Sequence, residues 1–344
     1  MKTSPKRLAI PALVLLSLGA IEGCGGGESR PSVVVYASLD REFSEPLLNA
    51  YAAKTGVAVD AKYDVESTKT VGLTNLLFAE AKAPRCDLFW NNEILNTLRL
   101  KKRGLLANWS PPNAESYPTV FKDKDGTWYG FAARARVLIV NTSLVPEADR
   151  PSSVNDLLDP RWKGKIGLAK PSFGTTATHA VCLFQILGEE KAKRFFTGLK
   201  ANDVRILSGN KQVATAVSSG ELAFGLTDTD DAMGELETGQ PVAIIYPDRK
   251  SEQMGTLYIP NTLAILKGAR HAEAAKALGN ALLAPETESI LASGPSAQVP
   301  LNPRSKVPSR VETPATVKAM AVDFDKAVDL WDGVAAFLKA EFGG

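Results

Sequence analysis

The hydrophobic positions of this chain switch repeatedly between the period of a strand and the period of a helix. A β-branched run at 32–39 is followed by helical spacing at 40–56 that stops at a glycine, and the same alternation continues along the chain with short joints. Strands that alternate with helices form a sheet with helices packed on its faces. The pattern therefore predicts a doubly wound α/β protein with a mostly parallel sheet.

The two periods also locate the individual elements. Further strands are expected at 57–64, 86–90, 165–174, 203–207, 221–228 and 241–248. Further helices are expected at 66–84, 92–106, 175–188, 189–201, 209–220, 230–239, 271–293 and 313–342.

One segment is too long for an ordinary strand. Residues 127–145 are β-rich and alternating throughout, as expected of a strand that crosses between two lobes, and 255–266 is the candidate return crossing. The predicted lobes are 32–135 with 262–305, and 136–261 with 306–344. In such folds ligands bind at the carboxyl ends of strands, so a ligand cleft is expected between the lobes.

The N-terminus carries an export signal. A basic stretch, MKTSPKR, precedes the apolar run LAIPALVLLSLGAI, which is too short for a permanent membrane anchor. The following IEGC is similar to the bacterial lipoprotein signal, which predicts a signal peptide at 1–24, lipid on Cys24 and a Gly-rich tether at 25–31. Ordinary secretion, with Cys24 as a bystander, is the alternative.

Composition and charge give no support for nucleic-acid binding. The 344 residues carry a formal net charge of +2, and no basic run is interleaved with aromatic residues, so a nucleic-acid groove is unsupported. Of the three cysteines, Cys86 and Cys182 lie in apolar patterns and are expected as buried free thiols.

The stretch GLTDTDDAMG places three carboxylates, those of Asp228, Asp230 and Asp231, directly after an apolar strand. Such a group could bind a cation. It could equally start a helix, with Asp228 or Thr229 as the cap and the other two aspartates in the first turn, where the helix dipole favours negative charge. Both roles could hold together.

The order of segments resembles the periplasmic ferric-iron-binding proteins of ABC importers, of extracellular solute-binding protein family 1. The likeness covers nearly the whole chain after the signal. The blocks that carry it are VVVYASLDREFSEPLLNAYAAKTGVAV, DLFWNNE, GFAARARVLIVNTSLV, DPRWKGKIGLAKPSFGTT, NKQVATAVSSGELAFGLTD and PNTLAILKGARHAEAAKAL. The resemblance implies a type II-like, two-lobed periplasmic-binding-protein fold.

The resemblance also implies a set of metal ligands. Asp40 stands where the family has a histidine, Glu93 matches the family's glutamate, and Asp230 and Asp231 stand where it has a tyrosine pair. Three of four positions therefore differ, and each replacement is a carboxylate. Asp40 and Glu93 could instead be solvated residues at the start of the helices that follow them.

The same resemblance implies an anion site. Gly174, Thr175 and Thr176 open a helix after a strand, where free N–H groups bind anions. Arg134 stands at the family's anion-binding arginine, and Asn210 and Asp228 match its polar cleft positions. Apart from the resemblance, the segment YDVESTK could also face the cleft through Glu66 and Thr68.

Several ligands satisfy these groups. Carboxylates suit hard cations such as Fe³⁺, Mn²⁺ or Ca²⁺, bound with a synergistic anion. A polyamine could use the same charges with Trp90, Trp128 or Tyr129 for cation–π contact. An aminophosphonate or another organophosphate would fit both the carboxylates and the predicted anion site.

Catalysis is not expected. The Asp-x-Asp of DTDDA is only superficially similar to the nucleophile motif of haloacid-dehalogenase-type phosphohydrolases, and the G-x-S-x-G elbow of serine hydrolases is absent. His179 and Cys182 lie in an apolar helix and are expected in the core. The sequence thus predicts a monomeric substrate-binding protein in the periplasm or at the cell surface, without a catalytic cofactor, which delivers its ligand to a permease and its ATPase.

Overall fold

The computed structural model describes Met1, residues 31–64 and residues 70–343. The predicted signal peptide, its lipidation site Cys24 and the tether up to residue 30 lie outside the described residues. Residues 31–344 form one compact unit. Over the part of the chain that the structure describes, every helix is too short or too polar to cross a membrane.

The first half of the sheet is built around β1. This strand pairs in parallel with β2 and β3, and β9 then pairs antiparallel with both β3 and β4. The strand order is β2-β1-β3-β9-β4, with bounds Ser32–Ala37 for β1, Ala58–Tyr63 for β2, Leu88–Asn91 for β3, Trp128–Asn141 for β4 and Tyr258–Ile265 for β9.

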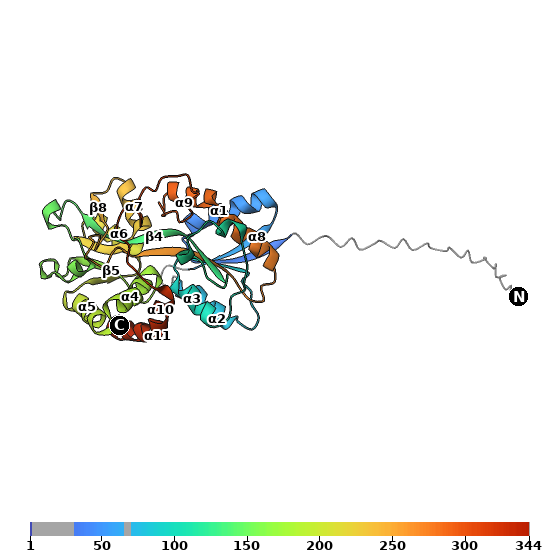
Figure 1. Cartoon of the computed structure of the whole chain (residues 1–344), viewed down its shortest axis with the longest axis horizontal. Coiled ribbons are helices and arrows are strands. Elements are labelled where there is room, and N and C mark those ends of the chain that lie inside the picture. The colour runs from blue at the N-terminus through green and yellow to red at the C-terminus, as the bar shows by residue number, and fades with distance from the viewer. Residues whose placement is uncertain (2–30, 65–69, 344) are drawn as a thin grey trace. The chain divides into compact units, whose positions relative to one another are not determined.

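The long strand β4 joins the two halves of the sheet (Figure 1). Its residues 128–135 pair with β9, whereas residues 136–141 pair with β7 and β8. This confirms the predicted crossing strand. The second half continues from β7 through β5 to β6, with bounds Ile166–Ala169 for β5, Arg205–Leu207 for β6, Phe224–Asp228 for β7 and Val242–Ile245 for β8.

The sheet is mixed, so the expectation of a mostly parallel sheet is wrong. Strands β1, β2 and β3 and strands β5, β6 and β7 pair in parallel, but every pairing of β4 and β9 is antiparallel. A strand that crosses between the two halves must meet the returning strand in the opposite direction, and strand periodicity carries no information on direction.

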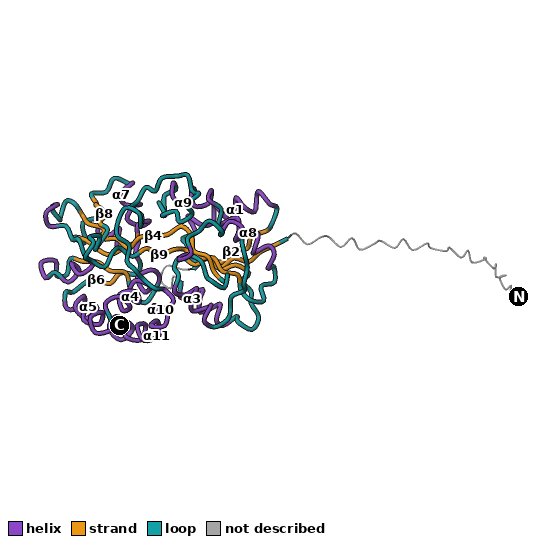
Figure 2. Tube along the Cα trace, viewed as in Figure 1, coloured by secondary structure: helices purple, strands orange, loops and turns teal. Residues whose placement is uncertain are grey.

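Helices pack on both sides of the strands (Figures 1 and 2). Their bounds are Arg41–Thr55 for α1, Val71–Ala79 for α2, Leu95–Lys102 for α3, Gly174–Leu187 for α4, Glu189–Ala201 for α5, Asn210–Ser218 for α6, Thr229–Glu237 for α7, Ala272–Leu282 for α8, Pro285–Ser293 for α9, Phe324–Ala327 for α10 and Trp331–Phe342 for α11.

Several predicted helices are wrong in extent, and the two longest differ most from the structure. The segment 271–293 is two helices, because Pro285 disfavours helical backbone in the residue before it and so ends α8. The segment 313–342 is helical only from Phe324. Its first part runs beside Thr256, which lies just before β9. The Thr256 backbone N–H donates to the Lys318 carbonyl, and the Thr256 carbonyl accepts from the Met320 backbone N–H, at 2.8 Å in both cases.

A bulge bends β4 at Ala132, whose φ is 42°. The carboxylate of Glu288, on α9, is fully buried and accepts hydrogen bonds from three backbone N–H groups there. The donors are Ala132 at 2.6 Å, Leu301 at 3.0 Å and Asn302 at 2.5 Å. Glu288 therefore ties the bend of β4 to the segment that follows α9.

The two cysteines among the described residues, Cys86 and Cys182, are buried and free, as expected. Burial raises the pKa of both thiols, so neither is a reactive thiolate at neutral pH. His179 is likewise buried on α4 beside Cys182, which confirms that both belong to the core.

Candidate functional site

Two arginines on β4 form the base of the candidate site. Arg134 and Arg136 are two residues apart on a strand, so their side chains leave the same face. Both side chains are almost completely buried, at 2% and 0% exposure. Buried guanidinium groups require acidic or polar partners. Those partners come from the starts of α4, α6 and α7.

Arg136 is bonded to Asp228, the last residue of β7, at 2.6 Å. The other carboxylate oxygen of Asp228 accepts from the Thr175 hydroxyl at 2.5 Å and from the Asn210 amide at 3.1 Å. Burial raises the pKa of Asp228, but the charges of Arg136 and Arg134 outweigh burial and hold that pKa below its usual value. Asp228 is therefore an ionised carboxylate at neutral pH.

Arg136 also organises the start of α4. It donates to the hydroxyl oxygens of Thr175 and Thr176, both at 3.2 Å, and to the Asn210 side-chain oxygen at 3.1 Å. Helix α4 begins at Gly174, whose φ of 55° is readily adopted by glycine. The predicted anion turn is thus a buried, hydrogen-bonded arrangement that joins β4, β7, α4 and α6.

Arg134 faces α7 and the loop after β3. It donates to Asp230 at 3.3 Å and to the backbone carbonyl of Asn92. Burial lowers the pKa of Arg134, but the charges of Asp230, Asp228 and Asp40 outweigh burial and raise that pKa above its usual value. Arg134 therefore keeps its positive charge next to the carboxylates.

The three aspartates of GLTDTDDAMG converge in space. One carboxylate oxygen from each of Asp228, Asp230 and Asp231 lies within 4.8 Å of the other two, so the group could hold a metal ion. Asp230 and Asp231 also lie in the first turn of α7, as the capping interpretation expects. Asp228 precedes that helix, but its side chain is bonded to Arg136 and does not cap the helix.

A small cavity lies between these groups. Its volume is about 20 Å³, close to the space of one water molecule or one ion. Its lining includes predicted residues and several that the sequence analysis did not assign. The lining residues are Asn92, Arg134, Ala169, Lys170, Phe173, Gly174, Thr175, Thr176, Ser208, Gly209, Asn210, Asp228 and Asp231.

Glu93 lies behind the cavity and is not among its lining residues. Its buried carboxylate accepts from the backbone N–H groups of Leu95 at 2.6 Å and Asn96 at 2.9 Å, at the start of α3. It also accepts from the side chains of Asn91 at 2.8 Å and Thr178 at 2.7 Å. In this conformation Glu93 organises the start of α3 and contacts α4, and its role as a metal ligand stays a prediction.

Asp40 is partly exposed and immediately precedes α1. Its charge acts on Arg134 and on Lys211 of α6, so it lies near the site, although it is not among the residues that line the cavity. Glu66 and Thr68 lie outside the described residues.

The main residue that sequence reasoning missed is Arg136. The signal was present, because two arginines with a spacing of two stand in an otherwise apolar strand, and that spacing puts both on one face. Asn92 also lines the cavity, and its side-chain oxygen has no hydrogen-bond partner among the described residues. A ligand in the cavity could supply that partner.

The aromatic residues expected beside an organic cation lie elsewhere. Trp90 packs against Phe131 with ring centres 5.5 Å apart, and the Tyr129 hydroxyl donates to the Trp109 carbonyl at 2.6 Å. Trp128 is also buried. None of Trp90, Trp128 and Tyr129 is among the residues lining the cavity, so the cation–π contact expected for a polyamine is not formed by them there.

Comparisons with known proteins agree with this architecture. The family model described as "Bacterial extracellular solute-binding protein" matches residues 87–329. Iron uptake protein A2 of Synechocystis is 28% identical over 297 residues, which cover 78% of this chain and 82% of that protein.

Two solved structures share the fold. Iron-bound HitA from Pseudomonas aeruginosa matches with a TM-score of 0.81 at 23% identity, over 90% of this chain and 99% of HitA. AfuA from Actinobacillus pleuropneumoniae, with fructose-6-phosphate bound, matches with a TM-score of 0.81 at 23% identity, over 92% of this chain and 99% of AfuA. The expected two-lobed, type II periplasmic-binding-protein fold is therefore confirmed.

Proposed function

Because this chain belongs to the bacterial extracellular solute-binding proteins, which bind solutes and do not catalyse reactions, we propose that it captures a hard cation together with an oxyanion. The binding proteins of ABC importers pass their ligand to a membrane permease, and the family places the chain outside the cytoplasm. The ligand would bind between two lobes with the predicted boundaries, 32–135 with 262–305 and 136–261 with 306–344.

The observation that carries the proposal is the convergence of Asp228, Asp230 and Asp231 within 4.8 Å, beside a cavity the size of a single ion. Oxygen ligands of this kind suit Fe³⁺, Mn²⁺ or Ca²⁺. The cation would fill this cavity, and the anion would bind next to it at the start of α4, whose Gly174 and Thr175 border the cavity. Iron(III) is the leading cation, because iron stands in the names of Iron uptake protein A2 and of iron-bound HitA.

A second candidate is an organophosphate or aminophosphonate. It is favoured by one observation: Arg136 and Arg134 already bond Asp228 and Asp230, at 2.6 and 3.3 Å. These ion pairs neutralise two of the three carboxylates, which weakens the attraction for a metal ion, and Lys170 in the cavity lining can attract an anionic group. AfuA, which has the same fold, holds fructose-6-phosphate.

The test is thermal unfolding of the metal-stripped protein with Fe³⁺ plus citrate or carbonate, with Mn²⁺ and Ca²⁺, and with aminoethylphosphonate and fructose-6-phosphate. A ligand at a hundred times its Kd adds about 2.7 kcal/mol to the unfolding free energy, which is several degrees in Tm. We expect the largest shift with Fe³⁺ and its anion.

Asp231→Asn is the informative variant, since Asp231 lines the cavity and is only partly buried. We expect it to remove the metal-dependent shift. Asp60→Asn, which makes the same charge change at an exposed site on β2, should keep it. A shift with the phosphonate or sugar phosphate alone would reject the cation and support the second candidate.

A further inference from the structure

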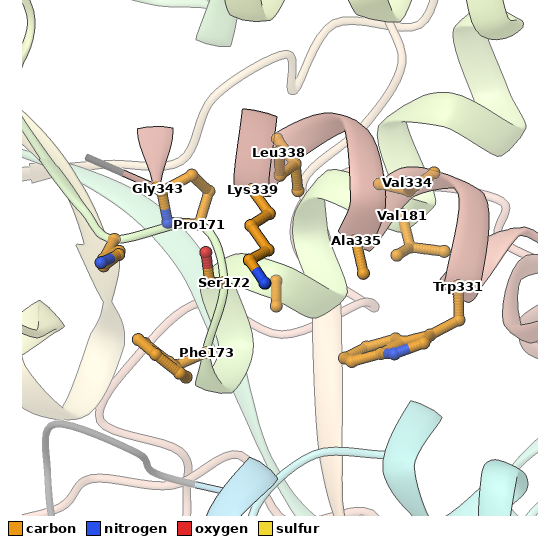
Figure 3. Close-up of a pocket in the computed structure, with 12 residues that line it drawn as sticks. Pro171, Ser172, Phe173, Val181, Trp331, Val334, Ala335, Leu338, Lys339 and Gly343 are labelled. Carbon is orange, nitrogen blue, oxygen red and sulfur yellow. The ribbon is translucent and has the colours of Figure 1, made fainter. Parts of the chain in front are cut away.

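A second, larger cavity, drawn in Figure 3, adjoins the aspartate site. Lys170 and Phe173, which precede α4, line both cavities. The second cavity has a volume of about 320 Å³, against about 20 Å³ beside the aspartates. Small-molecule sites usually have volumes of about 300–1,000 Å³. The space next to the ion-sized site is therefore large enough for an organic group.

The walls of this cavity are mainly apolar. Helix α4 contributes Ala177 and Val181 to the lining. The C-terminal helix α11 contributes Trp331, Val334 and Leu338 (Figure 3). The Trp331 ring is stabilised by the Arg99 guanidinium, which lies 4.7 Å from the ring centre. A fixed aromatic wall beside branched aliphatic side chains favours an alkyl or aromatic ligand group.

The charges of the lining are positive. Lys170 and Lys339 are its charged residues, and no acidic side chain is among the described residues that line it. In Figure 3 the Lys339 amine points into the cavity toward the Ser172 hydroxyl. An apolar cavity with two ammonium groups complements an anion that has an apolar body, and it disfavours a free cation.

We propose that the cavity between α4 and α11 binds the apolar body of an organic oxyanion whose acidic group lies at the start of α4. This inference rests on the proposed function and names its anion: an alkyl or aromatic phosphonate, phosphate or carboxylate, and not a bare inorganic ion. An inorganic anion would leave the apolar walls in contact with water, whereas burying an organic group there is favourable.

The test compares benzylphosphonate with methylphosphonate by isothermal titration calorimetry on the full chain, with and without Mn²⁺. The two probes share the acidic group and differ in the phenyl ring. We expect benzylphosphonate to bind about tenfold more tightly, the effect of burying part of one ring. Equal affinities, or no binding of benzylphosphonate, would overturn the inference.

Two variants of α11 provide a matched pair. Ala335 lines the cavity, and Ala336 is also exposed but is not among the lining residues. Ala335→Trp should fill the cavity and remove the preference for benzylphosphonate, while Ala336→Trp should keep it. An unchanged preference in Ala335→Trp would also overturn the inference.

Lys339→Glu should weaken benzylphosphonate binding, and Lys306→Glu, the same charge reversal at an exposed site that does not line the cavity, should not. Mn²⁺ is titrated separately into wild type and Asp231→Asn. The Mn²⁺ titration tests the cation site of the proposed function, and the benzylphosphonate titration tests the cavity between α4 and α11. Failure of one proposal is therefore distinguishable from failure of the other.

Discussion

The Asp228 carboxylate shows how one residue connects four elements. It is bonded to Arg136 of β4, Thr175 of α4 and Asn210 of α6, and it ends β7. Each bond involves a charged group in a buried position, where an unsatisfied partner would be costly. The aspartate thus stabilises the site in addition to any contact with a ligand.

His179 lies on α4 beside this network, and its ring nitrogens have no hydrogen-bond partner among the described residues. Burial, with the nearby charge of Arg136, lowers the pKa of His179 to about 3. The unfolded chain takes up a proton near pH 6.5. The native state therefore has its full stability above about pH 6.5 and loses it progressively as the pH falls toward 3.

We predict that His179→Leu removes this contribution to the pH dependence of the unfolding free energy. From pH 7 to pH 5 the wild type should lose about 2 kcal/mol more unfolding free energy than the variant. Urea unfolding at the two pH values measures the difference. Parallel losses in the two proteins would show that His179 is protonated in the native state without penalty.

At the scale of elements, β4 is decisive because one continuous strand carries both arginines and joins both halves of the sheet. The bulge at Ala132 lies two residues before Arg134 and sets the register that follows. A bulge shifts side-chain direction along a strand. The Glu288 carboxylate, which holds the bulge, therefore acts on the site through β4.

Glu288→Gln should destabilise the protein by about 2–4 kcal/mol, because one end of the amide is a donor and cannot accept a backbone N–H. Glu286→Gln, an exposed change in the same helix, should cost less than about 0.5 kcal/mol. Chemical unfolding of the two variants measures the difference. Similar stabilities would mean that the bulge does not depend on the carboxylate.

At the scale of the whole molecule, an ion pair joins α1 and α6 near the site. Lys211 of α6 contacts Glu42 of α1 at 3.3 Å, and both side chains are more than half exposed, at 63% and 59%. Water and salt screen such a pair, so it adds little to stability. It can still influence how the two halves approach each other around a ligand.

We therefore expect Glu42→Gln to change the free energy of unfolding by less than about 1 kcal/mol. Ligand affinity should fall by no more than about fivefold, and the effect should shrink at high salt. Calorimetric titration at two ionic strengths measures this. A salt-independent loss far beyond that size would mean that the pair is desolvated when the ligand binds.

The sequence by itself determined the elements and their order. Strand and helix follow from local periodicity, so β4, the helix start at Gly174 and the acidic first turn of α7 were predictable. The overlong β-rich segment 127–145 predicted two lobes, and the family resemblance implied the same arrangement. Buried Cys86 and Cys182 followed from their apolar neighbours.

Only the tertiary structure decided which charges meet. Arg136 and Asp228 are 92 residues apart, and Arg134 and Asp230 are 96 apart. Their pairing depends on strand register and on the bulge, which no local pattern encodes. The same holds for the cavity between α4 and α11, whose walls come from distant segments. Partners in space arise from packing, so the carboxylates and Arg134 could be singled out in the sequence, while their pairing with Arg134 and Arg136 could not.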